Sequence, residues 1–133
     1  MSLTPVLTVR DVGAAVDFYV RGLGASVVHR SGLVVEMAVA GARFRVAEEA
    51  PAAGNLSPAS LGGTTVRLNL LIDDPDSLVA AAVAAGAVEI SPVADQPFGL
   101  RQGRIEDPFG HHWLIGRPLP GVGDWVVAAQ PDK

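Results

Sequence analysis

Cysteine is absent from the 133-residue chain, and lysine occurs only at its last position. Without cysteine the chain has no disulfide framework, no thiol nucleophile and no cysteine-based zinc site. The net charge is −4, so the chain lacks the overall positive field that nucleic-acid binding favours. No apolar run approaches the roughly 20 residues that span a bilayer, and residues 1–11 lack the features of a signal peptide. We therefore expect a cytoplasmic protein that binds neither nucleic acid nor membrane.

The composition and length instead indicate one folded domain. Hydrophobic residues make up 49% of the chain and charged residues 18%, which argues against intrinsic disorder. A chain of 133 residues supplies one ordinary core, because a domain typically takes about 150 residues.

The two halves of the sequence repeat the same order of elements. Residues 7–11 and 70–74 are each an apolar-rich, strand-like run that ends in Asp. The segments that follow, residues 12–23 and 75–85, carry apolar residues at spacings of three and four, which predicts a helix in each. Repetition of this kind predicts a fold built from two similar modules.

Capping residues support both helices. Asp74 followed by Pro75 is typical of an N-cap with proline at the first helical position, where its missing N–H costs nothing. Gly24 and Gly86 follow the two helices and predict a left-handed glycine after each.

Each helix leaves room for three further strands. These strands are expected at residues 25–29, 34–39 and 43–46 in the first half, and at residues 88–93, 101–105 and 112–115 in the second. Each half is therefore predicted to be a β-α-β-β-β module, and the fold class is α+β with curved mixed sheets. We expect a single domain with modules at residues 4–49 and 64–117, an irregular linker at 50–63, and a tail at 118–133 that contains Trp125.

Alternation along the strands separates an apolar face from a mixed face. The apolar face must bury against the two helices, because each helix has an apolar stripe to cover. The mixed face collects Thr4, Val6, Thr8, Arg43, Arg45, Arg67, Asn69, Leu71, His112 and Leu114. Apolar walls with a few polar groups suit a cup that holds a small molecule. Alternatively, the three arginines pair with Glu36 and Glu106 across strands.

Four motifs carry a resemblance: residues 9–25 (VRDVGAAVDFYVRGLGA), Asp73-Asp74, residues 84–87 (AAGA) and residues 107–111 (DPFGH). Together they resemble the vicinal oxygen chelate superfamily, which contains glyoxalases, bleomycin-resistance proteins and extradiol dioxygenases. Residues 47–49, 57–64 and 98–101 further resemble its branch of small glyoxalase-like proteins. The resemblance covers residues 4–117 and implies paired β-α-β-β-β modules with outer helices. It also implies a homodimer with two equivalent pockets.

The enzymes of that superfamily hold a divalent metal with four side chains, typically His, Glu, His and Glu. Carried over through the local motifs, these positions are Thr4, Arg45, Arg67 and Leu114. A guanidinium is cationic and has no lone pair to give, leucine has no donor atom, and threonine alone is weak. The resemblance therefore implies a metal-free member that uses no cofactor, and no catalytic residue is assigned.

A metal-free member resembles the bleomycin-resistance type, which sequesters an antibiotic or another natural product at a dimer interface. The predicted ligand-binding residues are Thr8, Arg43, Arg45, Arg67, Asn69, Leu71, Phe98, Arg101, His112 and Leu114. The arginines would meet acidic or carbonyl oxygens or stack on planar rings. Phe98 and Arg101 lie in a loop that resembles the family's mobile one and could close the mouth, although Phe98 could equally anchor a hairpin.

Two other functions stay open. A glyoxalase-like lyase, isomerase or dioxygenase would need an unusual metal site or acid–base chemistry by His112 or Glu106. An assembly or regulatory module would instead have a filled cup and a tail around Trp125 that recognises another protein.

Overall fold

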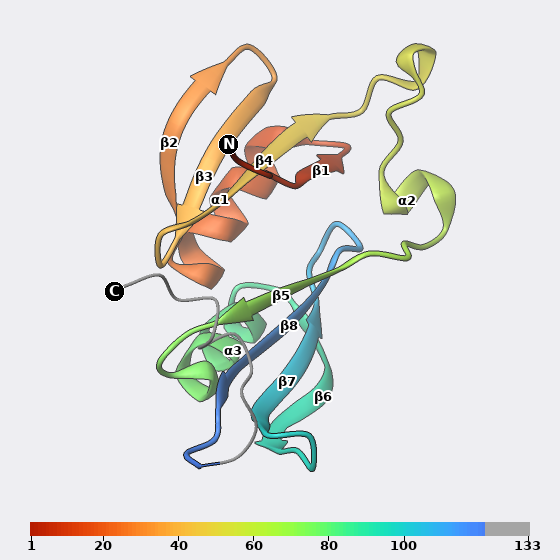
Figure 1. The fold of residues 1–133 in the computed structure, drawn as a ribbon. Coiled ribbons are helices and arrows are strands. Elements are labelled where there is room, and N and C mark those ends of the chain that lie inside the picture. The colour runs from red at the N-terminus through yellow and green to blue at the C-terminus, as the bar shows by residue number, and fades with distance from the viewer. Residues whose placement is uncertain (122–133) are drawn as a thin grey trace.

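The computed structural model describes residues 1–121 and contains two modules of the same design (Figure 1). The first module comprises β1 (Val6–Val9), α1 (Val12–Leu23), β2 (Ser26–Ser31), β3 (Val34–Val39) and β4 (Ala42–Glu48). The second comprises β5 (Arg67–Leu71), α3 (Pro75–Ala84), β6 (Val88–Asp95), β7 (Leu100–Glu106) and β8 (His112–Pro118). A short 3₁₀ helix, η1 (Pro51–Ala53), and α2 (Pro58–Leu61) lie between them. The predicted α+β fold with two β-α-β-β-β modules is confirmed.

Each module forms its own four-stranded mixed sheet. The strand orders are β1-β4-β3-β2 and β5-β8-β7-β6. The first and last strands of each module pair in parallel, whereas the other pairs are antiparallel. Parallel neighbours cannot be joined by a tight turn, so the helix and the two intervening strands of each module provide the long connection.

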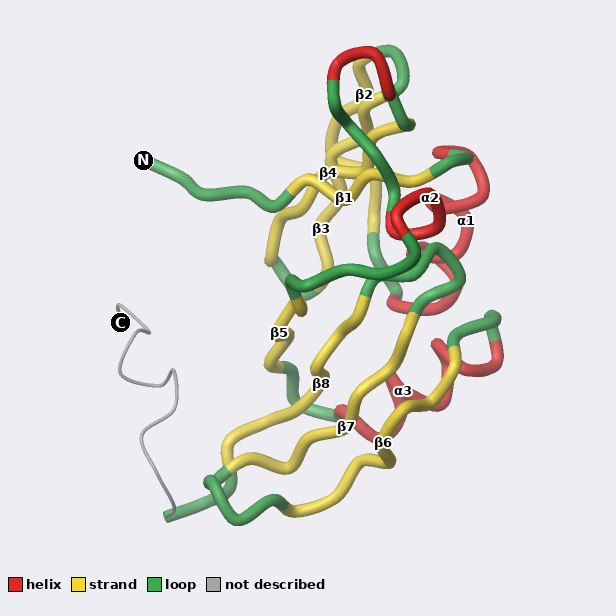
Figure 2. Tube along the Cα trace, turned by 90° about the vertical axis from the view of Figure 1, so that its right-hand side faces the viewer, coloured by secondary structure: helices red, strands yellow, loops and turns green. Residues whose placement is uncertain are grey.

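The helices cover one side of both sheets. In Figure 2, α1 and α3 both lie to the right of the strands, and they pack against each other. The uncovered faces of the two sheets consequently look to the same side of the molecule. We call these uncovered faces the open face. It carries Val6, Thr8, Arg43 and Arg45 in the first sheet and Arg67, Asn69, Leu71, His112 and Leu114 in the second.

A single hydrophobic core lies on the helix side and spans both modules. Buried strand residues from the first sheet and from the second belong to the same cluster. Tyr19 of α1 packs edge-on against Phe44 of β4 at a centroid distance of 5.3 Å, and it lies 5.8 Å from Trp113 of β8. Phe44 and Trp113 are themselves 5.5 Å apart. Aromatic packing of this kind stabilises beyond the area it buries and ties the modules together.

The predicted helix boundaries are largely confirmed. Asp74 caps α3 by accepting from the Ser77 N–H at 3.1 Å. Gly24 follows α1 in the left-handed region with a φ of 67°. Gly86 follows α3 with a positive φ of 125°, and the N–H groups of Gly86 and Ala87 donate to the carbonyl oxygens of Val83 and Ala82 at 3.1 and 3.0 Å, so a glycine also ends this helix as predicted.

The segment between the modules is more ordered than its sequence suggested. The composition predicts an irregular loop over residues 50–63, whereas the structure has two short helices there. Ser57 caps α2, Pro58 occupies its first turn, and Gly62 ends it with a φ of 85°. The Ser57 N–H and hydroxyl donate to Glu49 Oε1 at 2.8 and 2.6 Å. The capping signals were present, but the helix is too short to show periodicity.

Glu49 should make this segment sensitive to acid. The hydroxyl of Ser57, that of Ser60 and then the Ser57 N–H lower the pKa of Glu49 from its ordinary 4.5 to about 2. The stabilisation from these bonds is fully present above pH 4.5 and is lost as the pH falls towards 2. Between pH 4.5 and 2, we expect the free energy of unfolding to fall less in Glu49→Gln than in the wild type. Urea unfolding monitored by circular dichroism measures this difference. Glu89→Gln on β6 is the control, and an acid sensitivity equal to wild type in Glu49→Gln would contradict the prediction.

None of the helices within residues 1–121 is long and apolar enough to cross a membrane. Of the predicted tail, residues 122–133 with Trp125 lie outside the described residues, so the predicted role of that tail stays a prediction.

Candidate functional site

The first sheet contributes two arginines to the open face, and both are held by one carboxylate. Arg45 pairs in register with Val6 on one side and with Glu36 on the other, so all three point the same way. Arg43 Nη1 lies 2.7 Å from Glu36 Oε2, and Arg45 Nε lies 3.1 Å from Glu36 Oε1. Hydrogen bonds from Arg43 and then Arg45 lower the pKa of Glu36. The alternative stated from the sequence, in which arginines pair with Glu36 across strands, is therefore correct for Arg43 and Arg45.

The second sheet places a different set of charges on the same face. Arg67 of β5 pairs with His112 of β8, which pairs in turn with Glu106 of β7. The His112 Nε2 atom lies 3.9 Å from Glu106 Oε1. Arg104 donates from Nε to His112 Nδ1 at 3.1 Å. Within residues 1–121, Arg67 makes no ion pair with Glu106, so the cross-strand alternative does not hold here.

Apolar and amide groups lie beside these charges. Asn69 pairs in register with Leu114, which pairs with Arg104 across the next strand. Leu71 lies two residues along β5 from Asn69, and both leucines are half-buried. The structure thus brings Arg67, Asn69, Leu71, His112 and Leu114 together on one sheet, as the alternation predicted.

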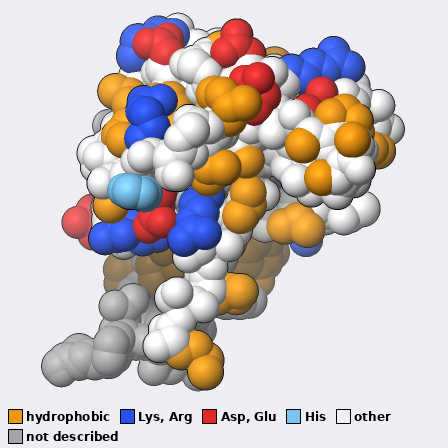
Figure 3. Space-filling model, turned by 90° about the horizontal axis from the view of Figure 1, so that it is seen from above, with side chains coloured by type: hydrophobic (Ala, Val, Ile, Leu, Met, Phe, Trp, Pro, Cys, Tyr) orange, Lys and Arg blue, Asp and Glu red, His pale blue; other side chains and the backbone are white. Residues whose placement is uncertain are grey.

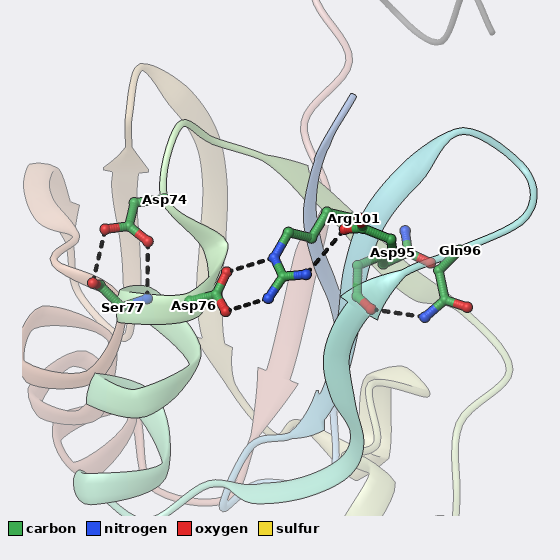
Figure 4. Close-up of polar contacts among 7 residues, drawn as sticks. Asp74, Asp76, Ser77, Asp95, Gln96 and Arg101 are labelled. Atoms are coloured by element: carbon green, nitrogen blue, oxygen red, sulfur yellow. Dashed lines mark hydrogen bonds and ion pairs between the residues drawn. The ribbon is translucent and has the colours of Figure 1, made fainter. Parts of the chain in front are cut away.

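Arg101 lies away from this face. It shares the helix side of β7 with Gly103 and Ile105, because side chains alternate along a strand. Its guanidinium contacts Asp76 of α3 at 2.7 and 2.9 Å and Asp95 of β6 at 2.9 Å (Figure 4). Hydrogen bonding by Arg101 lowers the pKa of Asp76. The structure therefore does not place Arg101 with the other predicted ligand-binding residues.

Phe98 lies in the connection between β6 and β7, and the residue is 47% exposed. This position is at one end of the second sheet, next to Gly99, which is buried. Its predicted part in closing the mouth of a site stays a prediction.

A cleft separates the two halves of the open face. It has a volume of about 720 Å³ and lies between the edge of β1 and the chain that leads into β5; it is lined by residues 5–8, 56, 58, 61–66, 68 and 111. His111 Nε2 lies 2.9 Å from the Thr8 carbonyl oxygen in this region. In the view of Figure 3, apolar side chains gather towards the η1–α2 segment, whereas acidic and basic side chains intermingle over the sheet. Of the predicted ligand-binding residues, only Thr8 lines the cleft.

Arg104 is the open-face residue that the sequence reasoning missed. The signal was available: Ile105 alternates as a buried residue, which places Arg104 on the opposite face beside Leu114. The motif search instead drew attention to Arg101, which points the other way.

The buried polar centre of the molecule is Asp107, and it is saturated with hydrogen bonds. Its Oδ1 atom accepts from the backbone N–H of Phe109 at 2.9 Å and of His111 at 3.0 Å. Its Oδ2 atom accepts from the Tyr19 hydroxyl and, at 3.0 Å, from Trp113 Nε1. Burial, and then the charge and hydrogen bond of Asp107, raise the pKa of the Tyr19 hydroxyl well above its ordinary value. A carboxylate with all these donors in place serves the fold.

The fold and the motifs agree with a match to a known family. Residues 3–115 match the model described as the glyoxalase/bleomycin resistance protein/dioxygenase superfamily. The chain belongs to this superfamily. An uncharacterized protein of Mycobacterium bovis is 35% identical in an alignment 142 residues long, gaps included, which covers 99% of this chain and 93% of the relative. An uncharacterized protein of Mycobacterium tuberculosis is also 35% identical, over 99% of this chain and 84% of its own length.

Several solved structures share the fold of this chain. A gene product of Arabidopsis thaliana has a TM-score of 0.71 at 30% identity, covering 88% of this chain and 98% of that one. TioX from a Micromonospora species has a TM-score of 0.70 at 28% identity, covering 89% of this chain and 100% of its own. A glyoxalase/bleomycin resistance protein/dioxygenase from Nocardioides has a TM-score of 0.71 at 22% identity, covering 100% of this chain and 89% of its own. At this identity the likeness shows a shared fold and nothing more.

The donor set at the superfamily's metal positions does not fit a divalent ion. Among residues 1–121, no three His, Cys, Asp or Glu side chains are grouped so that they could share a metal. Arg45 is held by Glu36, and Arg67 lies in register beside His112. Two guanidinium groups repel a cation, and neither Thr4 nor Leu114 offsets that repulsion.

Proposed function

We propose that this superfamily member is a metal-independent binding protein that sequesters a small natural product, such as an antibiotic, on its open face. The observation that carries the proposal is the composition of that face. Leu71 and Leu114 provide half-buried apolar surface next to the Asn69 amide and to the guanidinium groups of Arg67 and Arg104, which form no ion pair within residues 1–121. Such a combination suits an organic ligand, which needs apolar contact and a few orienting polar groups.

The superfamily's usual metal chemistry does not suit this face, which supports binding over catalysis. The four positions that would hold the ion carry Thr, Arg, Arg and Leu. No residue of the open face is arranged with a second group as nucleophile and base, because His112 accepts from Arg104 and its other nitrogen is 3.9 Å from Glu106.

The proposal is tested by screening natural products against the chain in the presence of a chelator. Thermal shift finds candidates and titration calorimetry gives their affinities; intrinsic fluorescence is a poorer readout because Trp113 is buried on the helix side. Leu114→Asp should lower the affinity for a confirmed ligand by at least about tenfold, since it places a charge against the apolar part of the ligand. Leu71→Ser, a milder change on the neighbouring strand, should weaken the same ligand less.

Val83→Asp is the matched control for this test. Val83 is 41% exposed on α3, on the helix side, so its variant carries the same new charge away from the open face. Affinity that is lost equally in Leu114→Asp and Val83→Asp, or in neither, would argue against the open face as the binding surface.

We also propose that two copies associate, as the superfamily resemblance implies. Apolar side chains around the cleft support this, since Leu61 is 64% exposed, Val66 67% and Val6 53%. Contiguous exposed apolar surface commonly marks an interface. Light scattering should give about twice the chain mass of 13.7 kDa, and Leu61→Glu should shift the mass towards one chain. A mass of one chain for the wild type would contradict this.

A further inference from the structure

The open face of the second sheet holds a cluster of basic side chains. Unlike the arginines of the first sheet, the arginines of this cluster are not paired with a carboxylate within residues 1–121. The cluster consists of Arg67, His112 and Arg104 on the three consecutive strands β5, β8 and β7. Arg67 and His112 are directly paired in register, and Arg104 reaches His112 from the other side. Two guanidinium groups therefore flank one imidazole.

The arginines of the two sheets differ in what holds them. Arg43 and Arg45 share Glu36 at 2.7 and 3.1 Å, so much of their charge is already compensated. Within the described part of the chain, neither Arg67 nor Arg104 lies within 4.0 Å of a carboxylate. An arginine without an acidic neighbour keeps its forked donors for an anionic ligand.

His112 orients Arg104 without adding a competing negative charge. An arginine Nε atom can only donate, so His112 Nδ1 is the acceptor and the neutral ring carries its proton on Nε2. This contact uses one N–H of Arg104 and leaves both Nη groups free to donate. The geometry of the fork is thus fixed before a ligand arrives, which lowers the entropy lost on binding.

The surroundings of the cluster indicate what the rest of the ligand must be. Leu114 lies in register between Asn69 and Arg104, and Leu71 is two residues farther along β5. A ligand held at its acidic end by the arginines would therefore lay an apolar or aromatic body on the leucines, with the Asn69 amide in reach. Glu106, 3.9 Å from His112, would repel a second acidic group placed on that side.

We propose that Arg67 and Arg104 form a carboxylate-binding subsite that selects ligands with one acid group and an apolar, planar body. The inference rests on the proposed binding function and narrows its ligand class. Arginine suits the task because two parallel N–H groups match the two oxygens of a carboxylate.

The probes are 2-naphthoate and its neutral analogue 2-naphthamide, titrated by calorimetry at low ionic strength, where surface charges are least screened. We expect the wild-type chain to bind naphthoate at least about tenfold more tightly than naphthamide, a difference of about 1.4 kcal/mol. Arg67→Gln and Arg104→Gln should each remove most of this preference, because the loss of the charge weakens naphthoate binding much more than naphthamide binding. Arg67→Lys should keep part of it, since the charge remains and the fork is lost.

Arg101→Gln is the matched control, because Arg101 is on the same strand as Arg104 and faces the helix side. It should retain the full preference for naphthoate. Equal affinity for the two probes, absence of naphthoate binding up to about 10 mM, or an equal loss in Arg101→Gln would overturn the subsite. If both probes bind equally and Leu114→Asp weakens both, the subsite fails while the proposed function stands. If Leu114→Asp weakens neither probe and no screened ligand, the proposed function itself fails.

Discussion

Asp107→Ala should lower the free energy of unfolding by about 4 kcal/mol, the largest effect of a single substitution that we expect in this chain. The substitution leaves four donors without their acceptor: the Tyr19 hydroxyl, Trp113 Nε1 and the His111 N–H, whose bonds are buried, and the part-buried N–H of Phe109. Each unsatisfied donor costs about 1–3 kcal/mol, and partial repacking recovers some of the sum. Urea unfolding monitored by far-ultraviolet circular dichroism measures the change.

Tyr19→Phe separates the contribution of one of these bonds. It keeps the ring that packs against Phe44 and Trp113 and removes only the hydroxyl that donates to Asp107. We expect a loss of about 1–2 kcal/mol. If Asp107→Ala lowered the free energy of unfolding no more than Tyr19→Phe does, the description of Asp107 as a carboxylate that satisfies several donors at once would be wrong.

Gly116→Ala should be nearly as damaging, with an expected loss of about 3 kcal/mol. Gly116 lies inside β8, where it pairs with Leu71 on one side and Gln102 on the other. A Cβ atom at this position would overlap the Arg101 carbonyl oxygen and would lie 3.1 Å from Gln102 Cβ. Because the first of these is a backbone atom of a paired strand, relief requires that β7 and β8 move apart.

Gly63→Ala is the control for that substitution. Its Cβ would meet nothing within 4 Å, and Gly63 does not have the positive φ that disfavours side chains. We expect its stability to stay within about 0.5 kcal/mol of wild type in the same urea titration. Equal unfolding midpoints for the two variants would show that β8 tolerates a side chain at Gly116.

The repeated order of elements could be predicted because each link in it depends on local chemistry. The apolar spacing of residues 12–23 matches α1 in full, and the alternation of residues 34–39 matches β3. What could not be predicted was the contact between distant segments. Tyr19 and Asp107 are 88 positions apart, and no periodicity shows that a hydroxyl on α1 meets a carboxylate after β7.

The sequence predicts which residues lie on the open face, but it does not predict which side chains on that face contact one another. Strand alternation placed Arg45, Arg67 and Leu114 on the open face, and the register agrees. Alternation cannot tell whether an arginine is free or held, which depends on rotamers and on neighbouring strands. Thus Arg45 is bound to Glu36 and Arg67 is without an acidic partner in the described residues.

The most direct test of metal-independent binding is to titrate a confirmed ligand into chelator-treated protein and then into protein with added zinc, nickel, manganese or iron. Because Thr4, Arg45, Arg67 and Leu114 offer no usual donor set for such an ion, we expect the two affinities to agree within about twofold. Binding that appears only when one equivalent of a metal is taken up would contradict the account.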